Sequence, residues 1–418
     1  MKESKHMKPV PLFLSILLCV FAASCGGSDG GGGTLPTTTV QALPLPGPYE
    51  VACSNVEQDF TRVGAGEDAE SYWEGAPSGN GMPRYATDLL ADPDNTLTVS
   101  VTAPQDPGIY GDYAGQTVEY VVLVFYPTTD DNPRPDYELP TRDVLPHMQT
   151  GLAPPLFADG SAYPVVVFSH GLNDSPISSE KYISALSIVA SYGYVVIAPF
   201  HGDSRFSDLK IDDLGDALGV ALNLENFTAL EAMRPLAISA ALTLVLEHPQ
   251  WKDHVDAAQV GGFGVSMGGE TMMLLGGAGL TTSYLDMGLS WERITFEPRL
   301  KAAVGYIPYF GQPVLPAFGR SQAGLVGVDL PFLGISGTQD KVAPIALTRT
   351  GMSRLEGRRI LVALEGVEHE FDDGSTDDIF TWILTFLDAE VRGDTDALQR
   401  LSTMGSVEGG GDDSVRLD

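Results

Sequence analysis

The chain has 418 residues and a formal net charge of −31, with 24 basic and 55 acidic side chains. This excess of negative charge disfavours nucleic acid and anionic lipid surfaces as partners, because both carry charge of the same sign. Apolar residues make up 43% of the chain, which is enough for a sizeable core in one large domain or two. No nucleic-acid partner is therefore expected.

Residues 1–24 are predicted to be a signal peptide. Three lysines open the segment, and an apolar run over residues 10–23 follows that is short for a transmembrane span. The run leads into Ala23-Ser24-Cys25, which resembles the lipobox of bacterial lipoproteins. The resemblance implies a lipid attached to Cys25 and a place at the cell envelope, as an outer-membrane lipoprotein facing the periplasm or the exterior. The alternative is a secretory signal that is cut nearby and releases the protein.

Composition suggests three further regions after the signal peptide. Residues 25–48 are rich in Gly, Pro and Thr with almost no charge, which predicts a flexible tether. Residues 49–392 are expected to form the folded domain, and residues 393–418 a polar, frayed tail. Cys53 is the only cysteine of the expected domain, so we predict no disulfide within it.

Apolar patterning predicts an α/β fold. Residues 96–101 and 117–126 are typical of antiparallel strands that open a sheet. From residue 164 onward, apolar runs alternate with segments of helical spacing, which favours a doubly wound and mostly parallel sheet. The expected later strands are 165–168, 194–198, a strand ending before Ser266, 302–307, 332–336 and 360–364. The expected helices are 179–192, 235–247 (with Pro235 in its first turn), 342–355 and 377–391. Residues 281–299, expected as a loop or short helical insertion, and 309–329 are predicted to be lid-like insertions.

The segment from Gly264 to Gly268 has the spacing Gly-x-Ser-x-Gly around Ser266. It follows a predicted buried strand and precedes a predicted helix, the context of a nucleophile elbow. A serine on such a sharp turn has a strained backbone, and glycines allow the chain to pass close to itself on both sides. Ser266 is therefore the predicted nucleophile.

A serine hydroxyl needs a base to take its proton and a third group to orient that base. When the acid and the base follow the nucleophile in the chain, His369 is the only histidine available. Asp340 is our candidate acid because it follows the predicted strand 332–336, at the sheet edge where such folds bind ligands. Asp340 could instead cap a helix, and Glu365 and Glu368 are rival acids.

Two backbone amides are expected to stabilise a developing oxyanion. One belongs to Met267, the residue after the nucleophile. The second is expected in the loop after the strand 165–168, where Leu172 is the candidate donor. His170 lies in the same loop but precedes the serine, so we expect it to shape the loop and not to act as the base.

Several motifs together resemble the α/β-hydrolase esterases. They are Phe168-Ser169-His170-Gly171, Val196-Ile197-Ala198-Pro199 with His201-Gly202-Asp203, Gly264-Val265-Ser266-Met267-Gly268-Gly269, and Gly337-Thr338-Gln339-Asp340 with His369. Over roughly residues 117–391 the chain is similar to the group of platelet-activating-factor acetylhydrolases and dienelactone hydrolases. Dienelactone hydrolases carry cysteine at the elbow, so Ser266 argues for ester hydrolysis. The acetylhydrolases usually have His-Arg-Asp at 201–203, so their phospholipid specificity is not carried over.

The resemblance and the residues lead to one main interpretation and two alternatives. The main one is a lipid-anchored serine esterase acting on a small or lipid-like ester. The alternatives are a serine peptidase of the same fold and a surface lipoprotein that binds a ligand without catalysis. No cofactor or metal is expected, because the sequence has no cluster with zinc spacing, no EF-hand loop at 372–378 and no dinucleotide motif at 261–264.

Overall fold

The computed structural model describes residues 35–57, 84–139, 141–207, 224–284, 286–312, 315–409 and 414–417. The predicted signal peptide, Cys25 and the first part of the predicted tether lie outside the described residues. The chain divides into two units, Met1–Thr34 and Leu35–Asp418, and the second contains every element described below.

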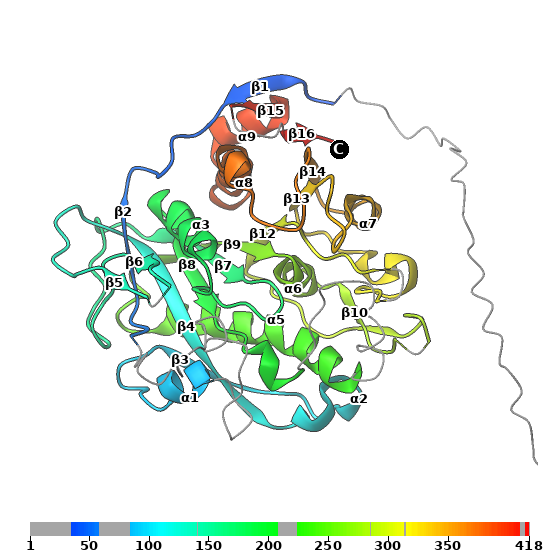
Figure 1. Ribbon diagram of the computed structural model, residues 1–418, viewed down its shortest axis with the longest axis horizontal. Coiled ribbons are helices and arrows are strands. Elements are labelled where there is room, and N and C mark those ends of the chain that lie inside the picture. Colours follow the sequence, from blue (N-terminus) through cyan, green and yellow to red (C-terminus); the bar gives the residue numbers. More distant parts are fainter. Residues whose placement is uncertain are drawn as a thin grey trace, which may run out of the picture. The chain divides into compact units, whose positions relative to one another are not determined.

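Ten of the described strands form one central sheet (Figure 1). They are β2 Glu50–Cys53, β3 Thr98–Thr102, β4 Thr117–Thr128, β7 Tyr163–Ser169, β8 Val195–Pro199, β9 Val255–Val265, β12 Leu300–Tyr306, β13 Phe332–Gly337, β14 Arg359–Leu364 and β16 Ser414–Arg416. Their order is β16-β14-β13-β12-β9-β7-β8-β4-β2, with β3 also on β4. The pairs from β8 to β14 are parallel, whereas β2, β3 and β16 pair antiparallel and β4 joins β8 antiparallel. This arrangement confirms the predicted α/β class and its mostly parallel sheet.

Helices cover both faces of the sheet (Figure 1). Alternate residues of β4 point to opposite sides: Val122 and Val124 join one apolar core, and Leu123 and Phe125 join the other. The first core also contains side chains of α5 Leu224–Glu247, α6 Met267–Leu275 and α7 Ile345–Met352. The second contains side chains of α3 Glu180–Ser191 and α8 Thr376–Leu387. The strands of a doubly wound sheet are buried in this way on both faces.

The remaining described elements are short. They are β1 Thr38–Gln41, α1 Arg84–Leu90, α2 Pro107–Tyr110, η3 Gly111–Tyr113, β5 Tyr137–Glu138, β6 Val144–Leu145, η4 Asp203–Arg205, β10 Gly279–Thr281, β11 Trp291–Arg293, η5 Arg320–Leu325, η6 Asp373–Ser375, η7 Asp388–Arg392, α9 Thr395–Thr403 and β15 Met404–Glu408.

The described parts of the segments expected as tether and frayed tail, residues 35–48, 393–409 and 414–417, take part in the folded unit. β1 pairs in parallel with β15, and β16 pairs with β14 at the edge of the central sheet. Leu401 of α9 and Met404 of β15 are buried in the same core as α8. The domain boundaries expected at 49 and 392 therefore do not coincide with structural boundaries. These described parts pack against distant parts of the chain, which their own composition does not reveal.

The helix expected at 235–247 begins earlier, at Leu224, so Pro235 lies in its interior and not in its first turn. Proline inside a helix costs about 3 kcal/mol or more. Phe227, Leu230 and Met233 are buried on the turns before it, and this burial offsets the cost. The part from Phe227 to Glu247 is long and apolar enough to cross a membrane, but 67% of its most apolar window is buried inside the protein, as in a central core helix.

The described part of 281–299 is mostly loop, as expected, and a short strand pair frames it. β10 and β11 pair antiparallel as a hairpin, with Gly279 opposite Arg293. Exposed apolar side chains gather in this part of the chain, among them Leu289, Trp291 and Phe296.

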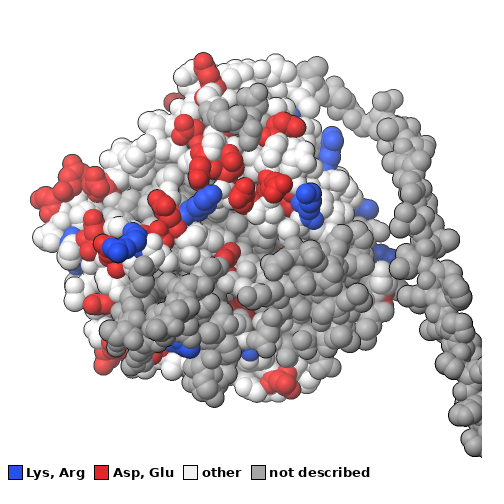
Figure 2. Space-filling view, in the orientation of Figure 1, with Lys and Arg blue, Asp and Glu red and all other residues white. Residues whose placement is uncertain are grey.

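Acidic side chains lie over much of the described surface on the face shown in Figure 2, with basic ones between them. This distribution agrees with the formal net charge of −31. A surface of this kind disfavours polyanionic partners.

Candidate active site

Ser266 occupies the turn between β9 and α6 with φ 52° and ψ −117°. A residue with a Cβ rarely adopts positive φ, so this backbone is strained and must be held by its surroundings. The Ser266 amide donates to the Tyr306 carbonyl at 3.0 Å, and the Ser266 carbonyl accepts from the Tyr309 amide at 2.9 Å. The turn is thus tied to β12 and to the loop that follows it.

Glycines permit the close approaches that the turn requires. A Cβ at Gly264 would overlap the carbonyl oxygen of Gly268, one turn further along the chain. A Cβ at Gly268 would overlap the carbonyl oxygen of Ser169 at the end of β7. The spacing that the sequence shows around Ser266 therefore corresponds to two real contacts.

The structure brings Ser266, His369 and Asp340 together in one hydrogen-bonded chain. Ser266 Oγ lies 2.9 Å from His369 Nε2, and His369 Nδ1 lies 2.7 Å from Asp340 Oδ2. The three residues follow β9, β14 and β13 respectively, so they meet at the carboxyl edge of the parallel strands. The Asp340 side chain is fully buried, and the imidazole keeps 20% of its surface exposed.

The second oxygen of Asp340 fixes the direction of its carboxyl group. Asp340 Oδ1 accepts from the amides of Val342 at 2.9 Å and Ala343 at 2.7 Å. The alternative role of Asp340 as a helix cap is not what the structure shows, because α7 has Pro344 at its N-cap. The rival acids Glu365 and Glu368 are exposed.

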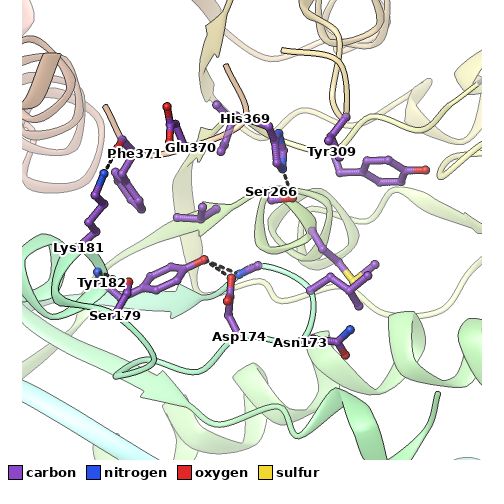
Figure 3. Close-up of a pocket in the computed structure, with 16 residues that line it drawn as sticks. Asn173, Asp174, Ser179, Lys181, Tyr182, Ser266, Tyr309, His369, Glu370 and Phe371 are labelled. Atoms are coloured by element: carbon purple, nitrogen blue, oxygen red, sulfur yellow. Dashed lines mark hydrogen bonds between the residues drawn. The ribbon is translucent and has the colours of Figure 1, made fainter. Parts of the chain in front are cut away.

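A cavity of about 580 Å³ opens beside Ser266 (Figure 3). Ser266 and His369 face each other in it, with Tyr309 on one side and Tyr182 and Lys181 on the other. The lining residues are Gly171, Leu172, Asn173, Asp174, Ser179, Lys181, Tyr182, Val265, Ser266, Met267, Ile307, Tyr309, Val342, His369, Glu370 and Phe371.

The two predicted oxyanion donors, Leu172 and Met267, both line this cavity. Neither backbone amide has a hydrogen-bond partner among the described residues. The predicted lid contributes little: within the part of the chain that the structure describes, only Tyr309 of the expected insertions 281–299 and 309–329 lines the cavity. The hairpin of β10 and β11 instead packs against η5.

Sequence reasoning missed Arg234, which lies on α5 beneath the loop 170–174. Its side chain is 2% exposed and pairs with the equally buried Asp203. Arg234 Nη1 donates to the His170 carbonyl and Nη2 to the Gly171 carbonyl, each at 2.7 Å. A single arginine within a long apolar helix was the available signal, because a buried guanidinium needs several acceptors.

A second serine–histidine pair lies under the same loop. Ser169 Oγ is 2.8 Å from His201 Nε2, and both residues are buried away from the cavity. His201 Nδ1 has no hydrogen-bond partner among the described residues, so no carboxylate orients this imidazole. Burial and the Arg234 charge lower the pKa of His201, which keeps the ring neutral.

His170 lies where the sequence placed it, inside the loop. Its Nδ1 donates to the Gly171 carbonyl at 2.9 Å, and its Nε2 accepts from the His201 amide at 3.2 Å. Burial, and then the Arg234 charge, lower the pKa of His170 to about 3. A permanently neutral ring with both nitrogens in use agrees with a role in shaping the loop.

Two buried carboxyl groups lie behind the nucleophile. Glu270 is in the first turn of α6, and Glu231 on α5 accepts from the Tyr284 hydroxyl at 2.9 and 2.7 Å. Burial raises the pKa of both groups, and the neighbouring Glu231 raises that of Glu270 further. A side-chain hydrogen bond joins Glu270 to Glu231, and it requires a proton on one of the two carboxyl groups.

Stability is therefore expected to fall as the pH rises above the ordinary pKa of a glutamate. In that range the folded protein keeps a proton that the unfolded chain releases, so the free energy of unfolding decreases with pH. Glu270→Gln removes one titrating group and should flatten this dependence. Denaturant unfolding at several pH values between about 5 and about 8 measures this pH dependence of the free energy of unfolding. Glu292→Gln, at an exposed position, is the matched control. If the free energy of unfolding had the same slope against pH in the wild type and in both variants, the raised pKa of Glu270 would be contradicted.

Residues 149–209 match the family model of platelet-activating factor acetylhydrolase, isoform II. The matched segment contains β7, α3, β8 and the loops at 170–174 and 201–203, and it ends before Ser266. Over that segment the match supports the resemblance to this group of hydrolases, which act on ester bonds. None of the curated proteins compared with the chain matches it.

Proposed function

We propose that this protein is a serine hydrolase of the α/β-hydrolase fold that cleaves carboxylic esters through an acyl-enzyme on Ser266. The observation that carries the proposal is the chain of hydrogen bonds from Ser266 through His369 to Asp340. Its order in the sequence, serine then aspartate then histidine, is the order typical of that fold. The family match at 149–209 favours an ester over a peptide as substrate.

The first step uses His369 as a general base. Its Nε2 takes the Ser266 proton while Oγ attacks the ester carbonyl carbon. The Asp340 carboxylate stabilises the imidazolium that results and keeps Nδ1 protonated. Negative charge develops on the carbonyl oxygen, where the Leu172 and Met267 amides would donate to it. The N-terminus of α6 adds a favourable dipole at the same point.

The second step uses His369 as a general acid. The imidazolium returns its proton to the leaving alcohol oxygen as the carbon–oxygen bond breaks, and the acyl group stays on Ser266. A water molecule then enters, His369 takes one of its protons, and the water oxygen attacks the acyl carbon. The bond from that carbon to Ser266 Oγ breaks, the imidazolium returns its proton to Oγ, and the acyl group leaves as a carboxylic acid. These steps require no group beyond the three side chains and the two amides.

We also propose that the protein is anchored at the cell envelope by a lipid on Cys25. The basic start, the short apolar run and the lipobox-like end of residues 1–25 support this proposal. The folded unit begins at Leu35, nine residues after Gly26 in the sequence, and the Gly-rich composition of that stretch suits a tether.

A panel of esters with graded acyl length tests the proposed reaction. The cavity of about 580 Å³ is of the size that holds a small molecule, so kcat/KM should be highest for short and medium acyl chains and fall for long ones. Initial rates with purified protein measure this. If no ester is cleaved but a peptide or anilide is, the protein is a peptidase; if neither is cleaved, the non-catalytic alternative holds.

A further inference from the structure

The loop that carries Leu172 is held by side chains that do not touch the cavity's reacting atoms. Arg234 donates to two successive carbonyl oxygens of this loop, those of His170 and Gly171, at 2.7 Å each. The guanidinium is buried and paired with Asp203, so it stays charged and fixed in place. A cation thus grips the backbone directly before the predicted oxyanion donor.

Because the peptide bond is planar, holding the Gly171 carbonyl also sets the direction of the Leu172 N–H. The Gly171 carbonyl and the Leu172 N–H belong to one planar trans peptide unit, so they point in opposite directions. Fixing the Gly171 oxygen therefore fixes the line along which the Leu172 N–H points. A hydrogen bond from a cation to the carbonyl also polarises the unit, which makes its N–H a stronger donor.

The peptide units on both sides of this one are fixed as well. The Gly171 amide donates to the Tyr182 hydroxyl at 3.0 Å. The Asn173 amide donates to Asp203 Oδ2 at 2.8 Å, while Asp203 Oδ1 accepts from Arg234 Nε at 3.0 Å. Leu172 lies between these two anchored neighbours, so its peptide unit has little freedom to rotate. We name Arg234, Asp203 and Tyr182 together the loop clamp.

We propose that Arg234, through the loop clamp, is a positioning residue that aims and strengthens the Leu172 N–H for the oxyanion of ester hydrolysis. This inference rests on the proposed function. The interaction gains strength only as negative charge develops on the carbonyl oxygen, so the clamp should affect kcat far more than KM. A residue needed only for folding would lower the amount of folded enzyme and leave the kcat of the folded fraction unchanged.

Arg234→Lys tests this directly. Lysine keeps the positive charge beside Asp203, but its single ammonium cannot span Asp203 and both carbonyls as the planar guanidinium does. Loss of one oxyanion donor costs about 10²–10³ in kcat, so a misdirected donor should cost on the order of 10–10² with KM nearly unchanged. Affinity for an alkylboronic acid, whose tetrahedral serine adduct places an oxygen at the oxyanion site, should fall by a similar factor.

Arg299→Lys is the matched control. Like Arg234, Arg299 pairs with a buried carboxylate, that of Glu297. It donates to Ser239 and Thr243 of α5, the helix that carries Arg234. It lies away from the cavity beside Ser266. We expect it to lower the thermal stability without changing kcat or the boronate affinity.

Tyr182→Phe provides a second, milder test that removes the acceptor of the Gly171 amide and, with it, the hydroxyl that donates to Asp174 Oδ2 at 2.7 Å. It should lower kcat by less than Arg234→Lys does. If Arg234→Lys does not fold, Tyr182→Phe alone tests whether the loop clamp positions the Leu172 N–H. Wild-type kcat and boronate affinity in the folded variants of an active enzyme would overturn the clamp and leave the proposed function intact. An unmodified protein that cleaves no ester would instead overturn the proposed function, and the clamp's role with it.

Discussion

Replacing Ser266 with alanine is expected to lower kcat for ester hydrolysis by about 10⁴–10⁶. The Ser266 hydroxyl is the atom that would form the acyl-enzyme, and alanine leaves His369 with no nucleophile to activate. The fold should persist, because the hydroxyl makes one hydrogen bond and alanine fits the same turn. Steady-state kinetics together with thermal unfolding of the purified variant measure both effects.

Ser169→Ala is the control for this result. Ser169 also contacts a histidine at 2.8 Å, but the pair is buried and its histidine has no orienting carboxylate. We expect this variant to keep most of its activity. If Ser266→Ala kept as much activity as Ser169→Ala does, Ser266 would not be the nucleophile.

Asp340→Asn is expected to lower kcat by roughly 10⁴, the size of the effect in a well-studied triad protease. The amides of Val342 and Ala343 already donate to one side-chain oxygen, and in the variant they would continue to hold the amide oxygen there. The asparagine NH₂ would then face His369 Nδ1 and donate to it. That bond favours the imidazole tautomer with the proton on Nε2, which cannot accept the serine proton.

Stability separates this explanation from simple damage to the fold. The variant keeps the shape of Asp340 and its two hydrogen bonds to backbone amides. Its free energy of unfolding should therefore stay close to that of the wild type while its kcat falls. Glu365→Gln and Glu368→Gln are the controls, and both should retain most activity. A nearly normal Asp340→Asn beside an inactive glutamate variant would mean that another carboxylate orients His369.

The nucleophile, base and acid could be proposed from the sequence because their signals are local or follow chain order. The glycines around Ser266 are adjacent to it, and the contacts of Gly264 and Gly268 explain why no other residue fits. Chain order left His369 as the only histidine after the serine. The buried strands were predictable for a similar reason, since their apolar runs are continuous.

Features that depend on contacts between distant segments could not be predicted. Arg234 reaches the loop 170–174 across more than 60 residues of chain, and its spacing within α5 gives no hint of the partner. Glu270 has the position of an ordinary acid in a first helical turn, so its burial beside Glu231 was invisible. β1 finds its partner β15 at the other end of the chain. In each case tertiary packing outweighs what the local composition favours.

Covalent labelling tests the central claim most directly. A fluorophosphonate reacts with a serine that has been activated by a base, so the purified protein should gain one adduct on the peptide that contains Ser266. Mass spectrometry should find the adduct in the wild-type protein and in Ser169→Ala, and should not find it in Ser266→Ala. A folded protein that cleaves esters while Ser266 remains unlabelled, or that carries the adduct on another residue, would contradict the account.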